Sequence, residues 1–397
     1  MRPDARIAAA IAILDEILAG VPAEQAMTRW ARSSRFAGSG DRAAIRDHVF
    51  SALRCRGSYT AFAGLQVPSG RALMLGYCLA SGIAVDDRFT GETFAPDRLT
   101  PAERERMRPP ETFAPAILAE LDCPAWLLPE LRRSLRDDLP ASLLALRERA
   151  PVYLRVNAAK SSVSDAASLL SSEGIEVRPV AGAELALEIL SNAGRLRNAR
   201  AYREGHVELQ DISPQAAVDT LDLVPGARVL DYCAGGGGKA LALAARGVAK
   251  LTAHDIDPRR MADLPARAVR AGARIKICDR NALRAKTFDL VLLDVPCSGT
   301  GTWRRTPDAK WRLTPARLEE LRRLQATILD RASAHVAPAG HLAYMTCSLL
   351  VEENRDRIDD FLARNPGWRL DGDRLFTPLS GGDGFYSALL TRGSGAA

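Results

Sequence analysis

The sequence lacks any long uncharged apolar run, and it contains no internal repeat or low-complexity tract. A helix needs about 20 consecutive apolar residues to cross a bilayer. The N-terminal apolar run, residues 7–14, is followed at once by Asp15 and Glu16, and its periodicity continues as in a helix. This pattern predicts an amphipathic helix rather than a signal peptide. We therefore expect a soluble protein, and the cytoplasm is the simplest location for it.

Cysteines are few and scattered, with no CxxC pair and no histidine at a metal-ligand spacing. They are Cys55, Cys78, Cys123, Cys233, Cys278, Cys297 and Cys347. An odd and widely spread set predicts neither a disulfide framework nor a zinc site. Each cysteine is therefore either a buried apolar side chain or a reactive thiol.

Neither sign of charge dominates strongly. The 397 residues include 54 Lys and Arg against 48 Asp and Glu, which gives a net charge of +6. This modest excess favours a polyanionic partner without identifying one. The length exceeds that of one typical domain and predicts two or three.

Three regions differ in their hydrophobic patterns. Residues 1–140 show helical periodicity and proline breaks, which predict a helical domain and a linker. Residues 150–205 contain PVYLRVN and IEVRPV around a helical stretch, which predict a small α/β module. Over residues 206–392, strand-like runs such as ARVLDYCA, KLTAHDID, RIKICD, FDLVLLDVP and HLAYMTC alternate with helices. That alternation predicts a doubly wound, mostly parallel sheet.

A glycine-rich segment, DYCAGGGGK at residues 231–239, follows a predicted buried strand and opens a helix. Its glycines can bring backbone N–H groups close to a ligand at the helix N-terminus. The spacing is not that of a phosphate-binding P-loop, and Ala240 stands where that motif needs a hydroxyl. A ligand loop and a purely structural tight turn both remain open from this segment alone.

Acidic residues end the next two predicted strands, at Asp255 and Asp279. A carboxylate at the carboxyl end of a parallel strand can accept both ribose hydroxyls. We expect Asp255 to do so and Asp279 to receive an adenine amino group, although either acid could instead cap the following helix. Together with the glycine-rich segment, these acids favour a nucleoside cofactor.

Two cysteines follow the last strands of this alternation, Cys297 in DVPCSGTG and Cys347 in MTCS. Open α/β sheets bind ligands at this edge. Carbon 5 of cytosine is too weak a nucleophile to attack a methyl sulfonium, but a thiolate added at carbon 6 turns the ring into an enamine. Asp294 could hydrogen-bond the cytosine edge as charge develops, and a second cysteine could assist release. These residues alone do not say which cysteine attacks.

Four segments, DYCAGGGGK, HDIDPRRM, DVPCSGTGTWRRTPDAKW and TCSLLVEEN, resemble in order the motifs of the RNA 5-methylcytosine methyltransferase family. That family includes the Sun/Fmu ribosomal RNA enzymes and the NOL1/NOP2-related proteins, and the likeness covers residues 150–391. It implies an α/β, Rossmann-like class I S-adenosylmethionine-dependent methyltransferase domain. The segment DRAAIRDHVFSALR is similar to the all-α NusB-like RNA-binding domain of the bacterial ribosomal branch.

The resemblance implies that Cys347 is the nucleophile and that Cys297 aids product release. It implies S-adenosylmethionine contacts from Cys233, Ala234, Gly235, Gly236, Gly237, Gly238, Lys239, Asp255, Asp279 and Asp294, and no metal. The family usually has alanine and proline where Gly235 and Gly236 stand, and this departure could loosen the loop and weaken cofactor affinity.

The resemblance implies an RNA substrate, with 16S ribosomal RNA as the first choice because of the NusB-like segment and transfer RNA as the alternative. A catalytically silent RNA-binding assembly factor is a further alternative. An amino-group methyltransferase is disfavoured, since DVPC replaces the [DN]PP[YF] signature of those enzymes.

Basic residues and tryptophans alternate after Cys297, in WRRTPDAKWRLTPARLEELRR. Such a pattern suits phosphate contacts and base stacking. We expect Arg304, Arg305 and Lys310 to contact RNA, beside Trp303 and Trp311. Arg155, Asn157 and residues 210–215 resemble family segments that line the substrate path.

Overall fold

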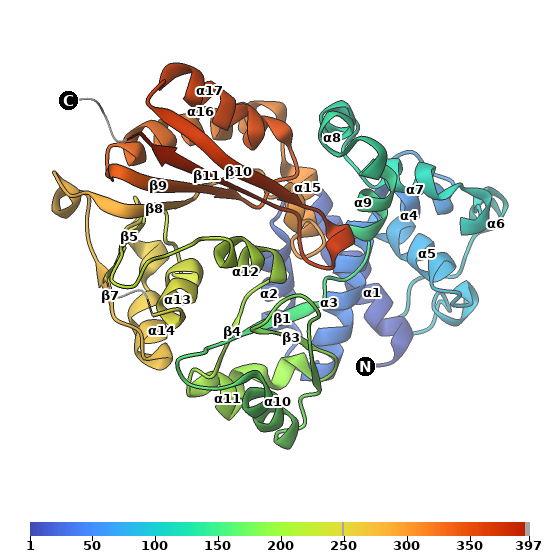
Figure 1. The fold of residues 1–397 in the computed structure, drawn as a ribbon. Helices are drawn as coiled ribbons and strands as arrows, with labels where there is room; N and C mark the ends of the chain where they lie inside the picture. The colour runs from blue at the N-terminus through green and yellow to red at the C-terminus, as the bar shows by residue number, and fades with distance from the viewer. Residues whose placement is uncertain (248–249, 394–397) are drawn as a thin grey trace. The chain divides into compact units, whose positions relative to one another are not determined.

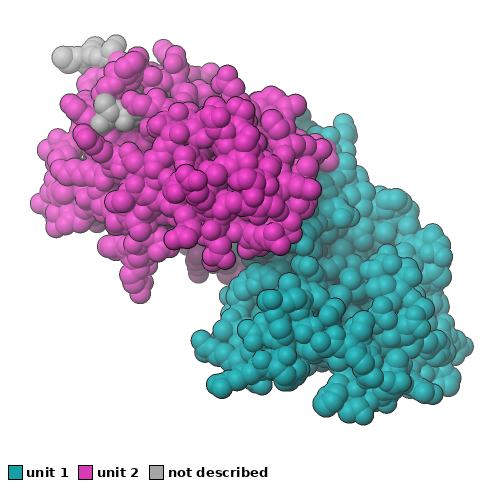
Figure 2. Space-filling view, turned by 90° about the horizontal axis from the view of Figure 1, so that it is seen from below, with its two compact units in different colours: residues 1–149, 302–313 teal, residues 150–301, 314–397 magenta. Residues whose placement is uncertain are grey.

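The computed structural model describes residues 1–247 and 250–393. The chain forms two compact units (Figure 2). The first, here called the helical unit, comprises Met1–Arg149 and Thr302–Leu313. The second, the sheet unit, comprises the rest of the described chain. The segment that follows the Cys297 loop therefore belongs to the helical unit.

Helices make up the regular structure of the helical unit, as the sequence predicts. They are α1 (Pro3–Leu18), α2 (Ala23–Ser33), α3 (Ser39–Arg54), α4 (Arg56–Phe62), α5 (Gly70–Ala80), α6 (Pro101–Arg106), α7 (Pro115–Leu121), α8 (Leu128–Leu135), α9 (Leu139–Ala145) and α15 (Pro307–Arg312). Proline opens α6, α7 and α15, because its missing N–H is tolerated in the first turn of a helix. Ile7 and Leu14 of α1 pack with Val49 and Leu53 of α3 and Leu73 of α5 in the core of this unit.

A small antiparallel sheet begins the sheet unit, in the order β2-β3-β1-β4. Its elements are β1 (Val152–Val156), α10 (Val163–Ser172), β2 (Val177–Pro179), β3 (Ala186–Ile189), α11 (Arg200–Arg203) and β4 (Val207–Leu209). The sequence pattern predicted β1, α10 and β2 but missed β3 and β4. Those two strands have only 4 and 3 residues, too short for a clear alternation.

A sheet of seven strands follows, in the order β10-β11-β9-β8-β5-β6-β7. The strands are β5 (Arg228–Asp231), β6 (Lys250–Ala253), β7 (Ile275–Ile277), β8 (Phe288–Asp294), β9 (Val336–Thr346), β10 (Trp368–Phe376) and β11 (Phe385–Arg392). Strands β5 to β9 are parallel, whereas β11 is antiparallel to both β9 and β10. The predicted doubly wound, mostly parallel sheet is therefore confirmed.

Helices cover both faces of the large sheet (Figure 1). They are α12 (Ile212–Asp219), α13 (Gly238–Ala245), α14 (Leu264–Ala271), α16 (Pro315–Ser333) and α17 (Arg355–Arg364). Successive residues of β8 point to opposite faces: Leu293 packs with Leu329 of α16 and Ile358 of α17, and Leu292 packs with Leu243 of α13.

Two features of the sheet unit were not evident from the sequence. Before α17, which begins at Arg355, Val351–Glu353 forms a separate 3-10 turn. Strand β10 was not predicted, since its sequence WRLDGDRLF is largely exposed and polar, as an edge strand can be. No helix in the described chain is long and apolar enough to cross a membrane.

Candidate active site

Cys297 and Cys347 follow the neighbouring parallel strands β8 and β9. Asp294, the last residue of β8, pairs in register with Met345 near the end of β9. The loops that follow therefore leave the sheet at the same edge, where α/β sheets bind ligands. The two sulfur atoms are 3.2 Å apart, and both side chains are partly exposed. The structure thus brings together the two cysteines selected from the sequence.

The surroundings of Cys297 hold a proton on its sulfur. The hydrogen bond with Cys347, followed by burial, raises the pKa of Cys297 well above that of an ordinary thiol. The negative charge of Glu353 acts in the same direction. Cys297 is therefore a protonated thiol at neutral pH, and it can donate a hydrogen bond to the sulfur of Cys347.

Most of the remaining cysteines behave as apolar core residues. Cys55, Cys78, Cys123 and Cys278 are buried, and Cys233 is partly exposed. Burial raises the pKa of Cys55 and Cys78 to about 11 and that of Cys123 to about 12. No group of metal-ligating side chains occurs among the residues that the structure describes.

The glycine-rich loop turns from β5, which ends at Asp231, into α13, which begins at Gly238. Gly235 and Gly237 have positive φ angles of 49° and 79°. A Cβ on Gly237 would lie 2.2 Å from Cδ1 of Leu264, so this position requires glycine both for its backbone angle and for space.

Arginines contact the loop at the two positions that depart from the family pattern. A Cβ on Gly235 would lie 3.5 Å from the guanidinium of Arg260, and one on Gly236 would lie 2.8 Å from that of Arg267. Arg267 also donates a hydrogen bond to the carbonyl of Gly236. The absence of side chains at these two glycines therefore leaves room for arginines from the segment after β6.

Asp255 follows β6 and lies against this loop with only 2% of its surface exposed. Its carboxylate accepts hydrogen bonds of 3.0 Å from the backbone N–H of Gly235 and of Asp257. Arg260 forms an ion pair with it at 3.1 Å. Protein donors therefore contact both oxygens, and Arg260, whose side chain is 48% exposed, would compete with any ligand that binds this carboxylate.

Three charged side chains meet between β5 and β8. Lys239 Nζ lies 2.5 Å from Asp294 Oδ2 and 5.1 Å from the ring centroid of Phe385. Asp231 is buried, and neither of its carboxylate oxygens has a hydrogen-bond partner among the described residues. Burial raises the pKa of Asp231 to about 7, although the charge of Lys239 opposes this rise. No role for Asp231 could be predicted from the sequence, because an acid at the end of a strand shows no local sign of being unpaired.

Asp279 is exposed and caps a 3-10 turn. Its Oδ1 accepts a hydrogen bond of 2.8 Å from the backbone N–H of Ala282, at the turn Asn281–Leu283. This is the capping role that the sequence allowed as the alternative to adenine recognition.

Two residues of the small sheet that were expected to line a substrate path are buried, and they hydrogen-bond to backbone carbonyls instead. Arg155 is 6% exposed and donates a hydrogen bond of 3.0 Å to the carbonyl of Gly238, and it also bonds to Gln210. Asn157 is 7% exposed and donates to the carbonyls of Gly205 and Ala271. Their side chains satisfy backbone carbonyls around the start of α13 and the end of α14, so that expectation is wrong for both.

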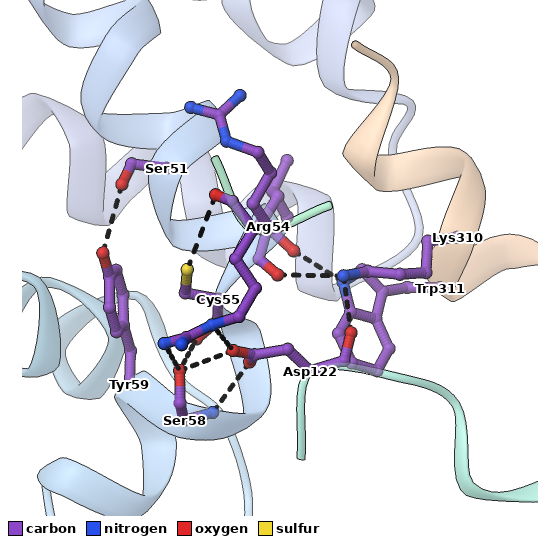
Figure 3. A network of polar contacts seen from close by, with 10 residues as sticks. Ser51, Arg54, Cys55, Ser58, Tyr59, Asp122, Lys310 and Trp311 are labelled. Carbon is purple, nitrogen blue, oxygen red and sulfur yellow. Dashed lines mark hydrogen bonds and ion pairs between the residues drawn. The ribbon is translucent and has the colours of Figure 1, made fainter. Parts of the chain in front are cut away.

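The prediction that the segment after Cys297 contacts RNA is also wrong for most of the residues named. Trp303, Arg304 and Lys310 are only 1%, 5% and 2% exposed. Lys310 Nζ donates hydrogen bonds to the carbonyls of Arg54 and Asp122 (Figure 3), and Trp311 Nε1 donates one to the carbonyl of Leu53. These basic and aromatic side chains are therefore part of the interior of the helical unit, where they donate hydrogen bonds to its backbone carbonyls.

The fold is the Rossmann-like fold of known methyltransferases. A structure from Pyrococcus horikoshii described as a methyltransferase homolog protein superposes with a TM-score of 0.58, at 24% identity, over 68% of this chain and 95% of that one. At this identity the likeness concerns the fold. Residues 218–390 match the family described as 16S rRNA methyltransferase RsmB/F, and residues 123–194 match its ferredoxin-like domain.

Curated relatives agree with this match. Ribosomal RNA small subunit methyltransferase B of Erwinia tasmaniensis is 36% identical over 68% of this chain and 66% of its own length. The Xanthomonas campestris protein of the same name is 33% identical over 70% of this chain and 69% of its own length. The chain belongs to the RsmB/F family, which confirms the resemblance seen in its motifs. It matches about two thirds of the length of these relatives.

Proposed function

We propose that the protein transfers a methyl group from S-adenosylmethionine to carbon 5 of a cytosine in 16S ribosomal RNA, through a covalent bond between Cys347 and carbon 6. The observation that carries this proposal is the pair of thiols 3.2 Å apart at the carboxyl ends of β8 and β9. The family description and the names of the relatives support the ribosomal RNA substrate.

The loop between β5 and α13 fits this cofactor. Asp231, Asp255 and Asp294 lie close enough together to influence one another's charge. A carboxylate beside a positively charged sulfonium favours its binding, and here Lys239 and Arg260 offset part of the negative charge. Asp255 would hold the ribose and Asp279 the adenine amino group, with residues 233–239 around the remainder. When bound, S-adenosylmethionine supplies an electrophilic methyl group.

Cys347 begins the reaction as a thiolate. Its sulfur forms a bond to carbon 6 of the cytosine, and the electron pair of the ring double bond moves toward carbon 5. Because Cys297 keeps its own proton, it can stabilise the Cys347 thiolate through the hydrogen bond between them. Asp294, which forms an ion pair with Lys239 at the end of β8, would hydrogen-bond the cytosine edge as charge develops.

Cys297 assists the end of the reaction. After carbon 5 is methylated, a base removes its proton and the bond between carbon 6 and the Cys347 sulfur breaks, with the electron pair returning to sulfur. A thiol donor within hydrogen-bond reach stabilises this departing thiolate. The raised pKa of Cys297 keeps that donor protonated.

The target cytosine must leave its stack to reach carbon 6, so an RNA loop or an opened segment is the expected substrate. We assign RNA binding to an N-terminal NusB-like domain over residues 1–140 and to a small α/β module over 150–205, and catalysis to residues 206–392. Arg42 on α3 is exposed and available for phosphate contact, whereas Arg46 pairs with Glu24 and Arg54 is buried.

Bisulfite sequencing of ribosomal and transfer RNA, from cells with and without the gene, tests the proposal. One cytosine in 16S ribosomal RNA should lose its protection when the gene is absent, and purified protein should restore it. Loss confined to transfer RNA would identify the alternative substrate. No change in either RNA, together with no binding of S-adenosylmethionine, would indicate a silent assembly factor.

A further inference from the structure

A buried carboxylate joins the two cysteine loops. Glu353 lies in the 3-10 turn Val351–Glu353 with 0% of its surface exposed. Carboxylates are rarely buried to this extent unless hydrogen bonds or ion pairs stabilise the charge. Glu353 was part of the motif TCSLLVEEN, but nothing in the sequence distinguished it from Glu352 beside it.

The hydrogen bonds of Glu353 reach the residue after each cysteine. Its Oε1 accepts 2.9 Å hydrogen bonds from the backbone N–H of Ser298 and from Nε2 of Gln325. Its Oε2 accepts hydrogen bonds from the hydroxyl of Ser298 and, at 2.5 Å, from that of Ser348. Ser298 follows Cys297 and Ser348 follows Cys347, so one side chain holds both loops.

Neighbouring bonds fix Glu353 in turn. Tyr344 of β9 donates a 2.7 Å hydrogen bond to the backbone carbonyl of Glu353. Gln325 of α16 also donates to the carbonyl of Pro296, directly before Cys297. Hydrogen bonds to a charged acceptor are about twice as strong as neutral ones. The loops also bond to each other directly, through Thr300 and the backbone of Gly301, but Glu353 contacts the residue after each cysteine at once, with a strand and a helix behind it.

We propose that Glu353 is a positioning residue that holds the Cys297 and Cys347 sulfurs at hydrogen-bond distance. This inference rests on the proposed function, in which the thiol of Cys297 supports the thiolate of Cys347. The hydrogen bonds of Glu353 go to the two serines beside the cysteines, so it acts on the sulfurs through them. A displacement of about 1 Å between reacting groups can reduce a rate about 100-fold, so loss of this bridge should affect chemistry more than binding.

Oxidation by diamide measures the sulfur separation without RNA or cofactor. Diamide takes up the two thiol hydrogens and leaves a disulfide, which requires the sulfurs to approach to about 2.05 Å. Mass spectrometry of the native, non-reduced protein would follow the Cys297–Cys347 bond. We expect rapid formation in the wild type and formation about 10-fold slower in Glu353→Gln, in which an amide N–H faces the donors of the two serines.

Kinetics provide the second measurement. In Glu353→Gln, kcat should fall about 100-fold while KM for RNA and for S-adenosylmethionine stays within about twofold. Glu103→Gln is the matched control, because Glu103 is 7% exposed in the helical unit and its carboxylate accepts hydrogen bonds from Thr100 and Arg71. It should lower thermal stability but change neither the oxidation rate nor kcat.

Wild-type oxidation and kcat in a folded Glu353→Gln protein would overturn the proposal. If that variant does not fold, Ser298→Ala combined with Ser348→Ala removes both hydroxyl donors and keeps the carboxylate. Wild-type rates in this double variant would equally overturn the proposal, and slowed rates would support it. A wild type that oxidises rapidly but methylates no cytosine would contradict the proposed function, while slow oxidation of Glu353→Gln would still support the positioning role.

Discussion

Lys310 donates a hydrogen bond of 2.6 Å to the backbone carbonyl of Asp122, three residues before the helical turn Ala125–Leu127 that precedes α8. A second bond of 2.9 Å joins the same ammonium group to the carbonyl of Arg54, at the end of α3. The lysine lies between the two cysteine motifs in sequence and is buried in the helical unit. The chain therefore leaves the Cys297 loop, completes the N-terminal unit, and returns to the sheet unit at α16. We infer that the N-terminal residues cannot be removed without exposing this segment.

Lys310→Met should destabilise the helical unit. It preserves most of the side-chain volume but leaves two buried carbonyls without their donor, and each unsatisfied buried group costs about 1–3 kcal/mol. Chemical denaturation should therefore show a large decrease in the free energy of unfolding of Lys310→Met. Arg312→Met in the same helix is the control, because that side chain is 60% exposed and should change stability by less than about 0.5 kcal/mol. Equal stabilities of the two variants would contradict the role given to Lys310.

Replacing Cys347 and replacing Cys297 should have different effects on the reaction. Cys347→Ala should abolish methyl transfer and every covalent RNA adduct, since carbon 6 then has no nucleophile. Cys297→Ala should still attack and methylate, but a denaturant-resistant complex with RNA should accumulate because the carbon–sulfur bond breaks slowly.

RNA containing 5-fluorocytidine provides the check, because fluorine cannot leave as a cation. Gel electrophoresis in denaturant should show a trapped adduct with the wild type and Cys297→Ala but not with Cys347→Ala. The reverse pattern would exchange the two roles. No trapping by a wild type that methylates the same RNA would exclude the covalent mechanism.

Asp255→Ala should weaken binding of S-adenosylmethionine, measured by calorimetry. Hydrogen bonds from ribose hydroxyls to a charged carboxylate are worth about 1.5–3 kcal/mol, which predicts a loss of roughly 10- to 150-fold. Unchanged affinity would mean that the ribose lies elsewhere.

Arg260→Ala should strengthen the binding of S-adenosylmethionine, again measured by calorimetry. Arg260 pairs with Asp255 at 3.1 Å, but its own side chain is 48% exposed. Such an ion pair contributes at most about 1 kcal/mol, so its removal should tighten binding by no more than about fivefold. Weaker binding would show instead that Arg260 contacts the cofactor.

Asp231 should make the stability of the protein depend on pH. Burial raises its pKa to about 7, whereas an unfolded aspartate titrates near about 3.9. Between these values the folded protein keeps a proton that the unfolded chain releases, so the free energy of unfolding falls as pH rises toward 7. Denaturation at several pH values should show this slope in the wild type and a reduced slope in Asp231→Asn. If the free energy of unfolding depends on pH equally in the wild type and in Asp231→Asn, Asp231 is not the source of the pH dependence.

Much of the fold could be predicted from the sequence because the relevant signals are local. Alternating strand and helix patterns after residue 206 predicted the parallel sheet, and a parallel sheet gathers the ends of its strands at one edge. That geometry alone brought Cys297 near Cys347 and the glycine-rich loop near Asp294. Short strands such as β3 and β4 were missed, since three or four residues carry too little periodicity.

Sequence by itself determined the family motifs, the alternation of strands and helices that builds the parallel part of the large sheet, and the choice of the two cysteines. Only the tertiary structure decided which polar side chains are buried and what they contact. Lys310 and Arg155 look like solvent-facing cations in sequence, yet distant backbone carbonyls accept their hydrogens. Glu353 resembles any helix-start acid, yet hydroxyls from two separate loops meet it. Burial of a charge depends on partners supplied from elsewhere in the chain, and no local pattern of residues records them.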